Sequence, residues 1–140
     1  MFYHGCLIHW FSKMQKSVSL SSAEAEYFGA MMTARDIMWL RDLLVDFRVP
    51  LSGASMLYTD SKSAVDLSMD PVAFKNTKHI MRAAEFLRDL VLRNAVGTQH
   101  VPGKCMIADL LTKAVARAVY VELLRLFDSY SVDGRVVLER

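Results

Sequence analysis

Three acidic residues stand where their side chains could bind a metal ion. Asp60 follows a short apolar segment typical of a buried strand, at the carboxyl edge where open α/β sheets place their sites. Glu26 lies in the first turns of a predicted helix, on the row shared with Ala30 and Ile37. Asp109 lies early in another predicted helix, within an apolar stretch. Hard divalent cations bind clustered oxygen ligands, so three such acids on separate elements indicate a metal site.

Each of these acids also has an ordinary structural explanation. Asp60 could cap the helix that follows it, and Asp109 could be a first-turn acid favoured by the helix dipole. Glu24 is two residues from Glu26 and therefore points to nearly the opposite side of the helix. Glu24 thus suits the helix cap, and Glu26 is expected to face the sheet. Spacing alone leaves both the structural roles and the metal site open.

Other polar side chains are candidates for catalysis or for binding phosphate. His100 lies on a predicted strand shortly before Asp109, and packing is favoured there over a catalytic role. Lys78 and His79 open a predicted helix, where backbone N–H groups attract phosphate. Lys75 and Arg82 are close enough in sequence to extend that patch. Contact with a nucleic-acid backbone and a merely solvated face are equally consistent with this pattern.

The elements that must position these residues alternate between strand and helix. Residues 2–11 are apolar and aromatic and predict a strand with a bend at Gly5. A capping box, Ser21 to Glu24, opens a long helix, and we expect a kink or break in it near residues 33–35. The remaining predicted elements are a strand at 55–59, a short helix capped by Ser61, a helix over about 78–91, a strand at 97–101, and one or two helices from about 106 to 127. This order predicts an α/β fold.

Length and composition bound the protein class. The 140 residues are 53% hydrophobic, which fits one compact domain. The net charge of +2 neither demands nor excludes a nucleic-acid partner. Cys6 and Cys105 have no metal-ligand spacing, and buried thiols in a reducing, intracellular setting are the simpler interpretation. No apolar run is long enough to span a membrane, and Trp10 and Trp39 are expected in or beside the core.

Four motifs in order resemble those of the ribonuclease H domains of copia-type retrotransposons. Residues 8–13, IHWFSK, also resemble the strand that precedes the first helix in that family. The four motifs are SLSSAEAEY at Ser19–Tyr27, LYTDSKSA at Leu57–Ala64, NTKHI at Asn76–Ile80, and HVPG at His100–Gly103 followed by ADLLTK at Ala108–Lys113. Their order and spacing over about residues 7–113 make coincidence an unsatisfactory explanation.

The resemblance implies a ribonuclease H-like fold over residues 1–127, truncated at its N-terminus, with a tail over 128–140. It implies hydrolysis of the RNA strand of an RNA–DNA hybrid, with two Mg²⁺ or Mn²⁺ ions. By motif, the residues that bind these metals are Glu26, Asp60 and Asp109. Two metals about 3.5–4 Å apart would activate the attacking water and stabilise the leaving oxygen. Cytoplasm or a virus-like particle is the expected location, with the nucleus also open.

The resemblance also predicts that one part is missing. The family's first catalytic aspartate lies on a central first strand, and no Asp or Glu precedes Glu24 here. We therefore expect an incomplete sheet with unpaired edges, completed by a strand from the rest of a Pol polyprotein. Two functions stay open: a hybrid-specific ribonuclease, and a catalytically dead remnant that binds nucleic acid or protein. An unrelated α/β interaction domain would make the four motifs accidental.

Overall fold

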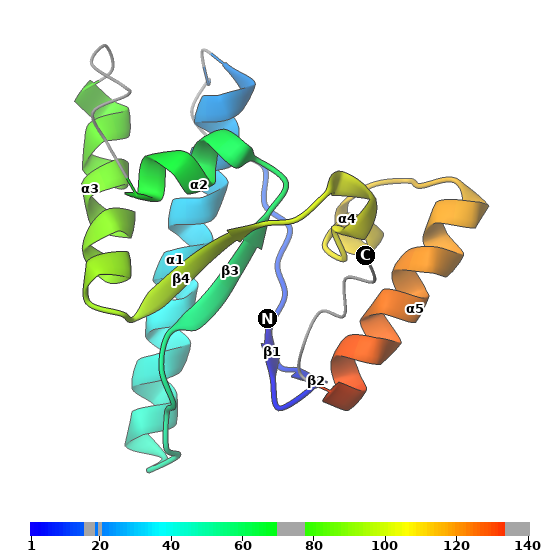
Figure 1. Ribbon diagram of the computed structural model, residues 1–140, viewed down its shortest axis with the longest axis horizontal. Helices are drawn as coiled ribbons and strands as arrows, with labels where there is room; N and C mark the ends of the chain where they lie inside the picture. Colours follow the sequence, from blue (N-terminus) through cyan, green and yellow to red (C-terminus); the bar gives the residue numbers. More distant parts are fainter. Residues whose placement is uncertain (16–18, 20, 70–77, 134–140) are drawn as a thin grey trace. The chain divides into compact units, whose positions relative to one another are not determined.

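The computed structural model describes residues 1–15, 19, 21–69 and 78–133, which form short strands and helices of the expected α/β class (Figure 1). The chain divides into two compact units. We call Gln15–His100 the helix–sheet unit, and Met1–Met14 together with Val101–Arg140 the terminal unit. The helix–sheet unit contains α1 (Ser22–Asp46), β3 (Ser55–Thr59), α2 (Lys62–Met69), α3 (Lys78–Leu92) and β4 (Val96–His100).

The strands β3 and β4 form a two-stranded parallel sheet. Their register runs from Ser55 opposite Val96 to Thr59 opposite His100. Leu57 is buried whereas its neighbour Met56 is 44% exposed, because successive side chains of a strand point to opposite faces. Figure 1 shows α1 and α3 together on one face of this sheet. Within the described residues, β3 and β4 pair only with each other, so the outer edge of each is unpaired.

Helix α1 begins at a side-chain cap and is continuous. The Ser21 hydroxyl accepts a hydrogen bond from the backbone N–H of Glu24 at 3.2 Å, as the capping motif predicts. The helix then extends over 25 residues without a break, so a break near residues 33–35 is wrong. One row of its side chains is buried: Tyr27, Ala30, Ala34 and Ile37.

The apolar faces of the three helices and the sheet form the core of the helix–sheet unit. Its other buried apolar side chains come from both strands, α2 and α3: Leu57, Val96, Ala64, Leu67, Ala84, Leu87 and Leu90. Ser61 caps α2 by accepting the backbone N–H of Ala64 at 3.3 Å, as predicted. A hydroxyl pair, Ser68 and Thr98, joins α2 to β4 at 2.7 Å.

The terminal unit combines a hairpin with the last helices. Its elements are β1 (Phe2–Tyr3), β2 (Cys6–Leu7), a 3₁₀ turn η2 (Gly103–Cys105), α4 (Asp109–Thr112) and α5 (Arg117–Asp133). His4 and Gly5 both have positive φ, 45° and 77°, as a two-residue hairpin loop requires. This confirms the bend predicted at Gly5. The rings of Phe2 and Phe127 contact edge to face, with centroids 5.2 Å apart.

Several local expectations are corrected. Trp10 and Trp39 are each 58% exposed rather than core residues, and Cys6 is also exposed. Strand β4 ends at His100, one residue before the predicted end. Helix α5 continues to Asp133, beyond the start of the tail expected at residue 128. In the part of the chain that the structure describes, no helix has the length and apolar character needed to cross a membrane.

Candidate active site

Asp60 lies where the sequence places it, at the carboxyl end of β3. Its side chain is exposed, and no hydrogen bond or ion pair engages its carboxylate within the described residues. The preceding Thr59 is buried, and its Oγ1 accepts the backbone N–H of Ser61 at 3.1 Å. Since Ser61 caps α2, Asp60 is not the helix cap that the structural alternative required. The carboxylate is therefore accessible to a ligand at the sheet edge.

His100 lies at the same edge of the sheet. It is the last residue of β4 and stands opposite Thr59 in the parallel register. Its side chain is exposed, so the packing role favoured from the sequence is wrong. A strand pattern is a poor guide to burial at this position, because only one face of the sheet is buried and His100 is the last residue of its strand. Asp60 thus directly follows β3, and His100 ends the adjacent parallel strand β4. Side chains at this edge of the sheet can reach one ligand.

The two glutamates of α1 differ from the expected arrangement. Glu24 is buried, with 3% of its surface exposed, whereas Glu26 is exposed. Glu26 therefore does not face the sheet, and Glu24 does not point into solvent. Helical periodicity alone therefore misjudges which of these two glutamates is buried. An exposed Glu26 can still take up a metal ion from solution.

The start of α1 lies toward the Asp60 end of the sheet. Arg41, near the end of α1, donates to the Gly53 carbonyl and to the Ser55 hydroxyl, both at 3.0 Å. Figure 1 shows α1 and β3 running in opposite directions from there. Measured from Arg41, Glu26 is about 22 Å back along α1. Measured from Ser55, Asp60 is about 16 Å further along β3. The two carboxylates are thus expected at similar heights, about 6 Å apart along that direction.

Asp109 belongs to the terminal unit. It is the first residue of α4, and its carboxylate lies 2.8 Å from the Nζ of Lys113. Its side chain is 18% exposed. The first-turn position expected as a structural alternative is therefore confirmed, together with an ion pair that the sequence analysis missed. The spacing of four residues between Asp109 and Lys113 is the signal that could have indicated this pair.

The donor chemistry suits a hard cation, but no site is assembled within the described residues. Carboxylate oxygens are the ligands that Mg²⁺ and Mn²⁺ prefer. Among the side chains that the structure describes, no three His, Cys, Asp or Glu residues gather as a metal site. Because Asp109 lies in a different unit from Glu26 and Asp60, the convergence of all three carboxylates stays a prediction.

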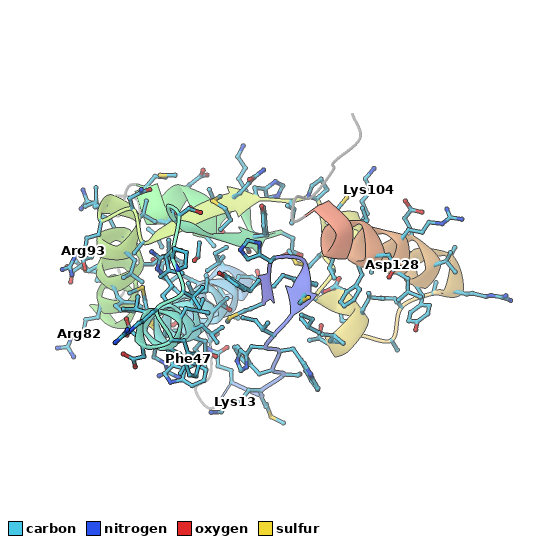
Figure 2. All side chains as sticks on the ribbon, turned by 90° about the horizontal axis from the view of Figure 1, so that it is seen from below. Lys13, Phe47, Arg82, Arg93, Lys104 and Asp128 are labelled. Atoms are coloured by element: carbon cyan, nitrogen blue, oxygen red, sulfur yellow. The ribbon has the colours of Figure 1, made fainter. Side chains whose placement is uncertain are left out.

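The predicted phosphate-binding patch is only partly described. Lys75 lies outside the described residues. Lys78 and His79 form the first residues of α3, which confirms that a helix begins there. Arg82 is exposed and projects outward from α3 in Figure 2. A role for these residues in binding nucleic acid stays a prediction.

One buried polar group has no counterpart in the sequence analysis. Tyr27 is 2% exposed, and its hydroxyl has no hydrogen-bond partner within the described chain. Burial raises the pKa of this hydroxyl from 10.0 to about 12. An unpartnered buried hydroxyl costs folding free energy, and such groups call for an explanation. Tyr27 is next to Glu26 in the sequence, so this unfavourable contribution to the folding free energy arises at the residue beside a candidate metal ligand.

Comparison with known proteins identifies the relatives of the chain. It is similar to the retrovirus-related Pol polyproteins from transposons RE2 and RE1 of Arabidopsis thaliana, with 35% and 34% identity over 113 residues. It is also 35% identical over 115 residues to that from transposon TNT 1-94 of Nicotiana tabacum. The chain is a homologue of one segment of copia-type Pol polyproteins. This confirms the relation to copia-type Pol polyproteins that the motifs indicate, and the ribonuclease H assignment stays a prediction.

The alignments cover most of the chain but little of each relative. They span 81% to 82% of this chain and 8% to 9% of the polyproteins. The chain therefore spans less than a tenth of the length of the Pol polyproteins that it matches. No protein-family model matches the chain, and no solved structure matches it significantly.

Proposed function

We propose that the chain is the ribonuclease H-like part of a copia-type Pol polyprotein and that it hydrolyses the RNA strand of RNA–DNA hybrids once its fold is complete. The observation that carries the proposal is the position of Asp60. It is an exposed carboxylate at the carboxyl end of a parallel strand, within a motif of a chain homologous to Pol polyproteins. The relatives indicate the family, and the edge of the sheet is where we propose that the reaction takes place.

Each candidate residue has a role in this proposal. Glu26, Asp60 and Asp109 would hold Mg²⁺ or Mn²⁺, and two such ions supply activation of water and stabilisation of the leaving oxygen. The phosphate backbone of the hybrid would contact Lys78, His79 and Arg82 in the first turns of α3, together with Lys75, which precedes them in the sequence. His100, exposed at the Asp60 edge, is a further candidate for contact with the reacting phosphate.

The unpaired sheet edges support a second part of the proposal. A preceding segment of the polyprotein would add a strand to the edge of β3 or β4 and bring a further aspartate to the site. Parallel strands are rarely stable as an isolated pair, because such sheets are normally covered and extended. In this proposal the added segment also supplies that carboxylate.

The alternative function is binding without catalysis. It is favoured by one observation: the described residues contain no assembled group of three metal ligands. A remnant that keeps the fold could still bind the backbone of a hybrid through its basic residues, since such binding is largely electrostatic. Hybrid affinity would then fall steeply with salt, without any cleavage.

The two functions are separated by measuring binding and cleavage together. The test protein is the chain joined to the preceding segment of its own reading frame, with labelled RNA–DNA hybrid, single-stranded RNA and duplex RNA as substrates. The proposal predicts Mg²⁺-dependent cleavage of the RNA strand of the hybrid. Asp66→Asn, an exposed acid on α2, is the matched control for Asp60→Asn and should retain activity. Salt-sensitive hybrid binding with no cleavage would favour the alternative.

A further inference from the structure

The ion pair between Asp109 and Lys113 differs from the other ion pairs between described residues. The Lys113 Nζ lies 2.8 Å from Asp109 Oδ1, and the acid is 18% exposed. In the pairs of Arg93 with Asp89 and of Arg125 with Glu122, the acids are 48% and 61% exposed. The Asp109 carboxylate is therefore the most enclosed of the three, and its attraction to a cation is the least screened by water.

Lys113 is held beside Asp109 by the backbone as well as by charge. Its backbone N–H donates to the carbonyl of Asp109 at 3.0 Å, and it is the residue that closes the short helix α4. The ammonium itself is on an exposed side chain, 60% of which meets solvent. An ammonium at this distance offsets the negative charge of the carboxylate and so weakens its attraction for a metal ion.

We propose that the Lys113 ammonium is the resident counter-ion of Asp109, and that it competes with a divalent cation for this carboxylate. This inference rests on the proposed function, in which Asp109 holds a metal. Lys113 is a positioning residue: it balances the enclosed carboxylate while no metal is bound, and it competes for Oδ1 when one arrives. As a result, the affinity of Asp109 alone for divalent cations is lowered. The metal ion is then retained only where further ligands bind it together with Asp109.

The test is a titration of the ¹⁵N-labelled 140-residue chain with Mn²⁺, followed by paramagnetic broadening of the Asp109 amide signal. Lys113→Met removes the competing charge and should lower the midpoint of broadening about two- to fivefold. That factor corresponds to about 0.4–1 kcal/mol, the size of a partly exposed ion pair. Lys113→Arg keeps the cation and should leave the midpoint near that of the parent chain. Asp109→Asn should remove the broadening.

Arg93→Met is the matched control for charge, because it breaks an ion pair of the same spacing in the helix–sheet unit. It should not move the midpoint at Asp109. An unchanged or higher midpoint in Lys113→Met would overturn the inference, and so would an absence of broadening at Asp109 in every variant. Neither result decides the proposed function, which is judged by cleavage of the hybrid by the longer protein. Failure of that cleavage with a lowered midpoint in Lys113→Met would reject the function alone.

Discussion

At the scale of single residues, the three candidate metal ligands lie in different surroundings. Asp60 and Glu26 are exposed, so a hydrated cation can approach them directly. Asp109 is largely enclosed and already faces the ammonium of Lys113. Metal binding at Asp109 therefore competes with a cation that is already present, whereas Asp60 is exposed to solvent at the sheet edge.

Tyr27→Phe is expected to stabilise the chain. The buried hydroxyl has no partner among the described residues, and removing an unpaired buried polar group recovers about 1 kcal/mol. Urea unfolding of both proteins measures this difference. Tyr58→Phe, at a half-buried position of β3, is the control and should bring no gain. A loss of stability in Tyr27→Phe would mean that the hydroxyl has a partner.

The same variant has a pH signature. Burial raises the pKa of Tyr27 to about 12, so the folded state favours the neutral phenol. Below pH 10 the group is protonated in both the folded and the unfolded state. Between about pH 10 and 12 the unfolded chain loses this proton first, so the free energy of unfolding falls as pH rises. Unfolding measured across this window should show a smaller fall in Tyr27→Phe, and an equal fall would contradict the assignment.

Residue-level prediction from sequence succeeds where a strand end or a cap fixes the position. Asp60 and Ser61 are placed correctly because a short apolar strand ends just before them. Glu24 and Glu26 are misplaced because burial in the first turn of a helix depends on tertiary packing, which helical periodicity does not include. Lys113 is missed because its role depends on the enclosure of Asp109, which is a property of the folded unit.

At the scale of elements, apolar periodicity identifies the helices and strands of the helix–sheet unit. Strand β3 has the predicted bounds, and α3 buries the predicted Ala84, Leu87 and Leu90. The unbroken α1 and the extension of α5 to Asp133 are not predicted. In both cases the sequence has no glycine or proline that would end the helix at the expected point, so helix length in α1 and polarity after residue 128 are poor guides.

Leu87→Ala should strongly destabilise the helix–sheet unit, whereas Leu92→Ala should not. Both changes delete the same atoms from α3, but Leu87 is fully buried and Leu92 is 73% exposed. The buried deletion leaves a cavity and costs about 2–5 kcal/mol. The exposed deletion should cost less than about 0.5 kcal/mol. Equal losses in thermal or urea unfolding would contradict the packing of α3 described above.

At the scale of the whole molecule, local sequence patterns do not determine which distant segments pair. The parallel register of β3 with β4 joins segments separated by two helices, and no local signal specifies it. The convergence of Asp109 with the other two acids is a long-range property of the same kind. The motifs could predict the Pol relatives because similarity between two sequences does not depend on how the strands pair.

The isolated chain is expected to be marginally stable and prone to association. Its two-stranded parallel sheet has an unpaired edge on each strand within the described residues, and exposed edges template pairing with other chains. Large apolar side chains such as Trp10 and Trp39 are also exposed. Light scattering should show association that increases with concentration and decreases when the preceding segment is joined. A monomer with a sharp unfolding transition at high temperature would contradict this expectation.

Hydrolysis of one labelled RNA–DNA hybrid tests the central claim most directly. Three proteins are compared side by side with Mg²⁺ or Mn²⁺: the 140-residue chain, the chain with its preceding segment, and that longer protein carrying Asp60→Asn. Two nearby divalent ions repel each other, so each missing carboxylate lowers their retention. We expect very weak cleavage by the short chain, a gain of orders of magnitude in the longer protein, and loss of that gain in Asp60→Asn. Robust cleavage by the short chain that disappears on Asp60→Asn would show that three carboxylates suffice and that the fold needs no added strand.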